Sequence, residues 1–311
     1  MLDMKKKTMI KYMTVTFAVS WVLQVIASIA ANTVEGANGQ GIFKGILALC
    51  MFIPMVGTLA AKGTLKGLGW VPKLNGKTVK FYLMAWLLPA VATALGAVLY
   101  FLIFPTHFDT TGAYIKMQGE ATGTDIMADM AKKGINYEGF VALNIITAFS
   151  GTFINALLAV GEEAGWRGFL NPALKERFGK VKGLLLGGVI WGVWHFPVIM
   201  IAGYEYGKEY IGAPFAGPVV FCIVTITWGI IADYVYEKTG CIWAAAIFHG
   251  SVNAFGILPM IFFEPKLADH MILGPVPVGI ISIIPTLAIA AVMLLRNREE
   301  IHEKAVAVNN I

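Results

Sequence analysis

The chain has 311 residues, of which 57% are hydrophobic and only 14% are charged. A soluble domain usually carries about 25% charged residues, and no soluble core needs so much apolar length. The formal net charge of +5 could suggest nucleic acid, but the basic residues flank apolar segments, so we expect no nucleic-acid partner. The composition predicts an all-α, polytopic protein embedded in a lipid bilayer.

Apolar runs long enough to cross a membrane recur along the whole chain. About 20 apolar residues cross the hydrocarbon core as a helix, and eight runs qualify: 10–31, 42–61, 80–104, 140–161, 183–202, 214–234, 241–262 and 276–295. The first is too long for the apolar region of a signal peptide, so we expect it to be retained. The second, which contains Pro54 and Gly57, is the weakest. The long connector 105–139 is polar enough to lie in water. We therefore expect a transmembrane helical bundle of about eight spans.

Basic residues predict the orientation of this bundle. An even number of spans puts both termini on one side, and that side then holds 18 of the 24 Lys and Arg residues. The other side holds six, namely Lys44, Lys116, Lys132, Lys133, Lys208 and Lys266. Cytoplasmic connectors are enriched in Lys and Arg. We therefore expect a multi-pass protein of a prokaryotic plasma membrane with both termini in the cytoplasm.

Three ionisable residues lie at the end of the fourth run. An ionisable group at membrane depth has a high free-energy cost. Glu163 and Arg167 are four residues apart in the order that favours an ion pair on one helix face. Glu162 lies about 100° around the helix. The spacing predicts a structural Glu163–Arg167 pair and an unpaired Glu162 that can serve as a general base. A cytoplasmic loop with three solvated charges is the alternative.

Polar side chains also occur within the fifth and seventh runs. His195 stands before Phe196-Pro197, and His249 and Asn253 are four residues apart on one helix face. Each is equally well explained as structural, because proline frees a backbone carbonyl and Asn joins membrane helices. Both histidines lie roughly 13 to 20 Å from the inner ends of their runs at about 1.5 Å per residue. A cavity open to the cytoplasm would bring Glu162 into the same layer and admit water.

Together these four side chains predict a hydrolytic site. The carboxylate would deprotonate water, and His and Asn would stabilise the oxyanion of a tetrahedral intermediate. Other polar residues are given no catalytic role. We expect Asp233 at the inner interface near Lys238, and the remaining histidines solvated in connectors or the tail, namely His107, His270 and His302.

These motifs resemble those of the CPBP family of intramembrane proteases. That family comprises the type II CAAX prenyl endopeptidases and the bacterial Abi proteins of bacteriocin processing and self-immunity. Its pattern is Glu-Glu-x-x-x-Arg, then aromatic-x-x-x-His, then His-x-x-x-Asn or Asp. The corresponding residues here follow in order on successive hydrophobic segments, over about residues 150–256: Glu162-Glu163-x-x-x-Arg167, Trp191-x-x-x-His195 and His249-x-x-x-Asn253. The aromatic residue is often Phe in the family, so Trp191 is a departure.

The resemblance implies roles for these residues. Glu162 would activate water together with His195, and His249 and Asn253 would hold the oxyanion. Glu163 and Arg167 would support the first motif. The family has been called both a metalloprotease and a glutamate protease, and one Glu with two His is also a zinc-ligand set. Zinc held by Glu162, His195 and His249 therefore stays open as a cofactor.

The sequence divides into three predicted regions. Residues 1–139 hold three spans and the outer connector, residues 140–262 form the CPBP-like catalytic core, and residues 263–311 hold the last span and a cytoplasmic tail. The predicted function is that of an endopeptidase acting on a CAAX-like C-terminus, a bacteriocin-like peptide or a lipidated protein. A transporter or proton relay is one alternative, although no inverted repeat supports it. A non-catalytic, peptide-binding immunity protein is another, which the intact motif set disfavours.

Overall fold

The computed structural model describes residues 2–309, and the side chains of residues 6–296. Across these residues the chain forms helices and no strand beyond one isolated bridge between Phe108 and Phe263. Seven helical stretches in the described part are long and apolar enough to cross a membrane: Lys6–Thr33, Gly36–Lys62, Val79–Ile103, Tyr137–Phe178, Lys180–Ala202, Ala216–Thr239 and Ile242–Phe262. The predicted all-α, multi-pass membrane bundle is confirmed.

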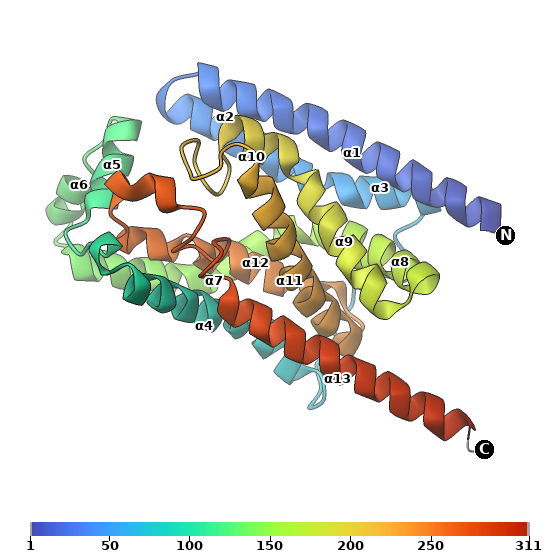
Figure 1. Ribbon diagram of the computed structural model, residues 1–311. Coiled ribbons are helices and arrows are strands. Elements are labelled where there is room, and N and C mark those ends of the chain that lie inside the picture. The colour runs from blue at the N-terminus through green and yellow to red at the C-terminus, as the bar shows by residue number, and fades with distance from the viewer. Residues whose placement is uncertain (1, 310–311) are drawn as a thin grey trace.

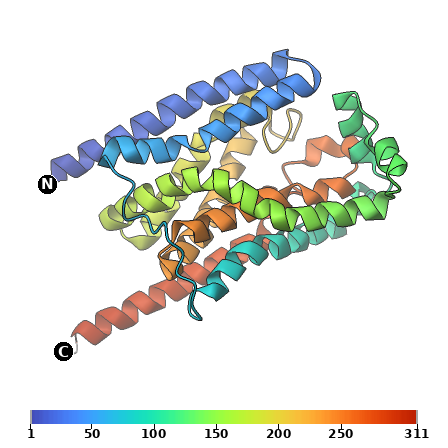
Figure 2. The same ribbon diagram turned by 180° about the vertical axis from the view of Figure 1, so that it is seen from behind.

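The second predicted span is two helices rather than one. Helix α1 (Leu2–Thr33) runs beside α2 (Gly36–Cys50) and α3 (Ile53–Lys62), as Figures 1 and 2 both show. Pro54 stands in the first turn of α3, where its missing N–H costs nothing because that group has no partner within the helix. The chain therefore bends between α2 and α3 while still crossing the bundle.

The middle of the chain contains the outer connector and the longest helical stretch. Helix α4 (Val79–Ile103) leads through η1 (Pro105–His107) to two short helices, α5 (Ala113–Thr122) and α6 (Ile126–Lys132). Helix α7 (Tyr137–Gly165) starts where the Asn136 side chain accepts a hydrogen bond from Gly139 N. It continues through the π-helical turn η2 (Trp166–Leu170) into α8 (Asn171–Phe178). Turns of this kind are frequent at functional sites.

The C-terminal part contains helices α9 (Lys180–Trp194), α10 (Phe196–Ala202), α11 (Ala216–Thr239), α12 (Ile242–Gly256), η3 (Leu258–Phe262), η4 (Pro265–His270) and α13 (Ile284–Asn309). The eighth predicted span starts later than expected, because residues 276–283 form turns. The apolar part of α13, Ile284–Arg296, is shorter than the seven long stretches.

The bundle has two distinct ends. The start of α1, the end of α13 and α8 lie at one, which we call the terminal end, together with connectors 63–78 and 239–241 (Figures 1 and 2). Helices α5 and α6 lie at the other, the connector end, with connectors 203–215 and 257–283. Backbone hydrogen bonds join these outer connectors: Asp109 N donates to Phe262 O at 2.8 Å, and Ile211 N to Asp269 O at 2.9 Å.

Two polar residues differ from expectation. His107 is buried, 5% exposed, with its Nδ1 2.7 Å from the Tyr100 hydroxyl, because the outer connectors fold over it. Asp233 is buried and accepts a hydrogen bond from Lys175 Nζ at 2.8 Å, and this contact joins α8 to α11. His270 is partly exposed, and the side chain of His302 is outside the described residues.

Glycines allow the helices that carry the polar motifs to pack closely. A Cβ at Gly250 of α12 would lie 2.5 Å from Thr152 O of α7, and one at Gly161 of α7 would lie 2.6 Å from Met51 O. Small residues let membrane helices approach in this way. The backbones of α7 and α12 therefore meet beside the two Glu residues and His249.

Candidate active site

A buried ion pair joins the end of α7 to the π-helical turn. Arg167 Nη1 donates to Glu163 Oε1 at 3.0 Å, and both side chains are almost fully buried. His249 Nδ1 lies 2.9 Å from the same carboxylate oxygen. The pair expected from the i, i+4 spacing therefore forms, and the solvated-loop alternative is wrong. Glu163 also fixes α12 against α7, which the sequence did not predict.

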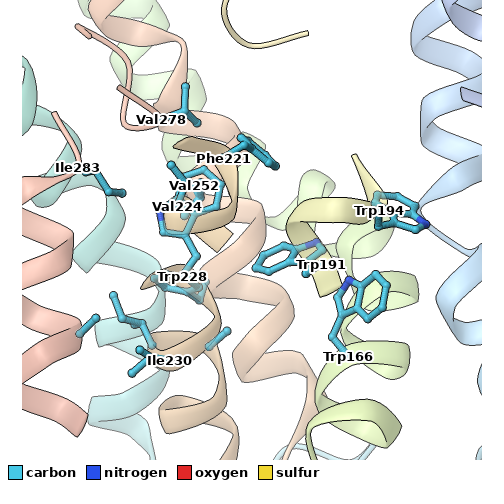
Figure 3. Packing of buried hydrophobic residues seen from close by; sticks show 14 of the residues in the cluster. Trp166, Trp191, Trp194, Phe221, Val224, Trp228, Ile230, Val252, Val278 and Ile283 are labelled. Atoms are coloured by element: carbon cyan, nitrogen blue, oxygen red, sulfur yellow. The ribbon is translucent and has the colours of Figure 1, made fainter. Parts of the chain in front are cut away.

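Glu162 faces a different set of partners. Its Oε2 accepts hydrogen bonds from Trp191 Nε1 at 2.8 Å and from Trp166 Nε1 at 3.1 Å. Figure 3 shows these two indoles, which come from η2 and α9. The Arg167 guanidinium lies over the Trp191 ring, 4.5 Å from its centroid. Trp191 therefore contacts both charged groups, through its Nε1 to the Glu162 carboxylate and through its ring face to the Arg167 guanidinium.

His195 lies where α9 ends, three residues after Gly192. Its backbone N donates to Gly192 O at 3.0 Å, which leaves Trp191 O without its usual i+4 partner. Pro197 prevents the helix from continuing unbroken. His195 Nδ1 lies 2.9 Å from that free carbonyl oxygen. A carbonyl can only accept, so Nδ1 carries the proton. In the neutral imidazole, Nε2 then keeps its lone pair. His195 can thus have the structural role considered above through Nδ1 and a chemical role through Nε2.

The four predicted site residues share one cavity of about 600 Å³. Two tryptophans, Trp191 and Trp228, line it together with these four residues. Its other lining residues reach Tyr114 of α5, Gly207 and Pro277, which belong to the connector end. The structure therefore brings Glu162, His195, His249 and Asn253 together, as their depths in the sequence suggested.

The cavity is lined from the interior of the bundle and from the connector end. Among the described residues that line it, none comes from the connectors 63–78 or 239–241 or from α8 at the terminal end. Cytoplasmic termini and a cytoplasm-facing cavity both stay predictions.

Comparison with known proteins identifies the segment that carries the site. The family described as type II CAAX prenyl endopeptidase Rce1-like matches residues 144–255. This segment is similar to the Rce1-like family. A stretch of 130 residues is also 31% identical to a protein named CAAX prenyl protease 2 from Methanococcus maripaludis, covering 42% of this chain and 48% of the relative. The chain thus matches about half the length of that relative, and the CAAX-protease resemblance read from the motifs is confirmed.

The matched segment lies inside the predicted core of residues 140–262, whose own limits stay a prediction. In the part of the chain that the structure describes, no three His, Cys, Asp or Glu side chains are grouped so that they could hold one metal ion. Glu163 contacts Nδ1 of His249, and two indoles donate to one oxygen of Glu162, which leaves His249 Nε2 and Glu162 Oε1 without these partners. Zinc held by Glu162, His195 and His249 stays a prediction.

Two features of the candidate site were not predicted from the sequence. Trp166 follows Glu162 by four residues, so its indole could have been predicted to face that carboxylate. Glu205 lines the cavity with a φ of 70°, in the left-handed region that side chains other than glycine rarely adopt. Burial raises its pKa above the usual value. Its position follows from how the 203–215 connector folds, which no local pattern predicts.

Proposed function

We propose that this protein is an intramembrane endopeptidase that hydrolyses a peptide bond with water activated by Glu162. The single observation that carries the proposal is the meeting of Glu162, His195, His249 and Asn253 in one cavity within the bundle. The similarity to the Rce1-like family, whose name describes prenyl endopeptidases, supports peptide-bond hydrolysis as the reaction. CAAX-like tails and bacteriocin-like peptides are the substrate classes that the resemblance favours.

Water activation follows from the two groups that can accept a proton. Glu162 would take a proton from a water molecule while the oxygen attacks the carbonyl carbon of the scissile bond, and would later deliver it to the leaving nitrogen. The unprotonated Nε2 of His195 would accept a hydrogen bond from the same water. The hydrogen bond from Nδ1 to Trp191 O supports this role because it fixes the ring and its tautomer.

The oxyanion requires donors on the opposite side of the carbonyl. The Asn253 amide would be one donor and His249 Nε2 the other. His249 can donate at Nε2 while bonded to Glu163 at Nδ1 only as an imidazolium. The Glu163 carboxylate, 2.9 Å from Nδ1, favours that charged form. Glu163 and Arg167 would thus act through His249 and not on the substrate.

The decisive experiment is cleavage of a panel of prenylated and unmodified peptides by the purified protein, followed by mass spectrometry. Glu162→Gln keeps the shape and the indole contacts but removes the proton acceptor, so cleavage should fall by about 10²- to 10⁴-fold. Glu138→Gln, on the exposed first turn of the same helix, is the matched control and should cleave normally. Full activity of Glu162→Gln would refute the mechanism.

Removal of metal ions distinguishes this mechanism from a metal-dependent one. After chelation and dialysis, the glutamate mechanism predicts an unchanged cleavage rate with or without added zinc. Loss of cleavage on chelation and its return with zinc would assign activity to a metal site. If no peptide is cleaved but some bind, the protein would instead be a peptide-binding immunity protein.

A further inference from the structure

A second carboxylate lines the cavity that holds the candidate site. Glu205, in the 203–215 connector, lines it together with Glu162 and His195. The residue before it, Tyr204, also lines the cavity, and its ring lies nearly parallel to that of His195 with 6.4 Å between the ring centroids. A cavity of about 600 Å³ has the size of a small-ligand site. A substrate bound at Glu162 would therefore share this space with the Glu205 carboxylate.

The backbone of Glu205 is in a conformation that its residue type rarely adopts. Its φ is 70°, and among the described residues every other positive φ belongs to a glycine. Glycine adopts this region without steric cost, so the turn itself does not need a glutamate. Strained residues of this kind cluster at active sites and ligand clamps, where the surrounding structure holds them. The strain therefore indicates a role for the Glu205 side chain.

Contacts on both sides hold Glu205 in this conformation. Gly207 N donates to Gly203 O at 2.8 Å, which closes a turn around Glu205. The next residue, Tyr206, is fully buried, and its hydroxyl donates to Val278 O at 3.0 Å. The turn is thus tied to the connector 257–283, so the Glu205 carboxylate is held in the cavity wall before any substrate binds.

The Glu205 carboxylate has no cationic partner among the described residues. Its one side-chain hydrogen bond within that part of the chain is with the Tyr204 hydroxyl, and no Lys, Arg or His there forms an ion pair with it. Burial raises the pKa of Glu205 above its usual value. A carboxylate taken out of water is unfavourable unless a cation compensates its charge. A positively charged group that entered the cavity would therefore complete this site.

Glu162 is less suited to bind such a charge. Its Oε2 already accepts hydrogen bonds from two indoles, and the Arg167 guanidinium lies 4.5 Å from the ring centroid of one of them, Trp191. Glu162 is also the proton acceptor of the proposed reaction. A cation bound to it would favour its ionised form and so make it a weaker base. A charged group of the substrate would therefore lie at Glu205 while the scissile bond lies at Glu162.

We propose that Glu205 is a specificity-determining residue that binds a positively charged group of the substrate. The group would be the side chain of a Lys or Arg near the scissile bond, or the free α-amino group of a short peptide, since both present N–H donors on a cation. A carboxylate held in this way selects basic over neutral segments. The inference rests on the proposed function for the act of cleavage, and adds a contact that positions the substrate away from the reacting atoms.

The test compares peptides that differ in one charge. A peptide that the purified protein cleaves is resynthesised with Lys, Gln or Glu at each position near the scissile bond, and with a free, acetylated or succinylated N-terminus. Values of kcat/KM are measured for the wild type, Glu205→Asn, Glu205→Lys and Glu209→Asn. Asn tolerates the left-handed conformation. Glu209, exposed in the same connector, provides the matched control.

In the wild type and in Glu209→Asn, Lys at one position, or the free amino group, should raise kcat/KM about 10- to 100-fold, the effect of one hydrogen bond to a charged group. The set of peptides that shows the preference identifies the source of the charge. Glu205→Asn should lose the preference, and Glu205→Lys should favour a negative charge at the same place, which a misfolded variant could not do. An unchanged preference in Glu205→Asn, or no preference in the wild type, would overturn the proposal.

Thermal unfolding separates this role from a structural one. Glu205→Gly relieves the backbone strain, so its melting temperature should be no lower than that of the wild type. A clear drop would assign Glu205 to the fold and contradict the proposal.

A binding measurement separates the inference from the proposed function. Calorimetry on the Glu162→Gln background gives the Kd of the Lys and Gln peptides without cleavage. Tighter binding of the Lys peptide, lost when Glu205→Asn is added, is expected even if the wild type cleaves no peptide of the panel. In that case the proposed function fails and the role of Glu205 in binding stands. Equal binding of both peptides to a protein that is active as the wild type would refute the role of Glu205 alone.

Discussion

Trp191 does more than fill the aromatic position of its motif. Its indole donates to Glu162, and its ring face carries the Arg167 guanidinium. Phe, the residue often found there in the resembling family, could provide the second contact but not the first. The departure from the family pattern thus supplies Glu162 with a hydrogen bond that holds its carboxylate in the cavity.

Trp191→Phe should keep the ring contact with Arg167 while removing the donor to Glu162. A hydrogen bond to a charged group contributes about 1.5–3 kcal/mol, and Trp166 remains as a second donor. We expect a folded protein whose cleavage rate falls about tenfold. Trp21→Phe, on the exposed face of α1, is the control. Equal cleavage rates for the two variants would show that the indole donor is irrelevant.

Arg167→Ala should affect the fold more than the chemistry. Removing one partner of a buried ion pair costs about 3–5 kcal/mol because the other charge is left uncompensated. Glu163 would lose its only cation in α7 and η2 and keep His249 alone. The melting temperature of the purified protein should drop clearly. Lys132→Ala, in an exposed pair with Asp129, should leave it unchanged. A normal melting temperature with complete loss of cleavage would give Arg167 a direct catalytic role.

At the residue scale, the sequence predicted the side-chain contacts that form within a single helix. Glu163 and Arg167 meet because four residues make about one turn. The bond between Glu163 and His249 joins residues 86 positions apart, so it depends on which helices pack together, and spacing contains no information on that. The motif order nevertheless predicted which side chains share the cavity.

At the scale of elements, close packing of α12 on α7 sets the position of His249. Gly250 follows His249 directly, and a Cβ there would lie 2.5 Å from the backbone of both Thr152 and Ala156. Backbone atoms in helices cannot move aside as a flexible side chain can. The glycine therefore sets the distance between the two helices.

Gly250→Ala should push α12 away from α7 and lengthen the contact of His249 with Glu163. Overpacking costs about 1–3 kcal/mol, so both the melting temperature and the cleavage rate should fall. Gly151→Ala is a matched control on the other side of the same boundary, because its Cβ would meet only Ala254 Cβ, at 3.9 Å. If both variants behave alike, the close approach is not what positions the site.

Hydropathy located the long helices but not all of their limits. Residues 276–283 are apolar and not helical, and Val276 and Val278 are buried in the bundle, 4% and 2% exposed. Gly274, Pro275 and Pro277 break the helix there. An apolar segment is one that is buried away from water, and this is as true of a packed turn as of a membrane span. The glycine and prolines were the available signal that residues 276–283 are not helical.

At the scale of the whole molecule, the outer connectors pack around His107, which is 5% exposed. Burial lowers the pKa of His107, and nearby His270 lowers it further, while Asp269 opposes the change. Glu264 N donates to His107 O at 3.0 Å, which joins this residue to the last connector. Neutral His107 is therefore part of the folded connector end.

Acidification should loosen this end. The unfolded chain binds a proton on His107 near pH 6.5, whereas the folded protein does so only at lower pH. Its contribution to stability is present above about pH 6.5 and is lost as the pH falls below that value. The melting temperature should therefore drop between pH 7.5 and 5, and less so in His107→Gln. An identical pH dependence in the variant would exclude His107 as the cause.

Water in the cavity would also change where the membrane potential falls. A water-filled cavity would bring the potential of the adjoining solution to Glu162, so the voltage would drop across the packed residues around the buried Glu163–Arg167 pair. Moving one elementary charge through 100 mV requires about 2.3 kcal/mol. A charged peptide in such a cavity would cross little of that voltage, so an energised membrane would neither drive nor hinder its entry.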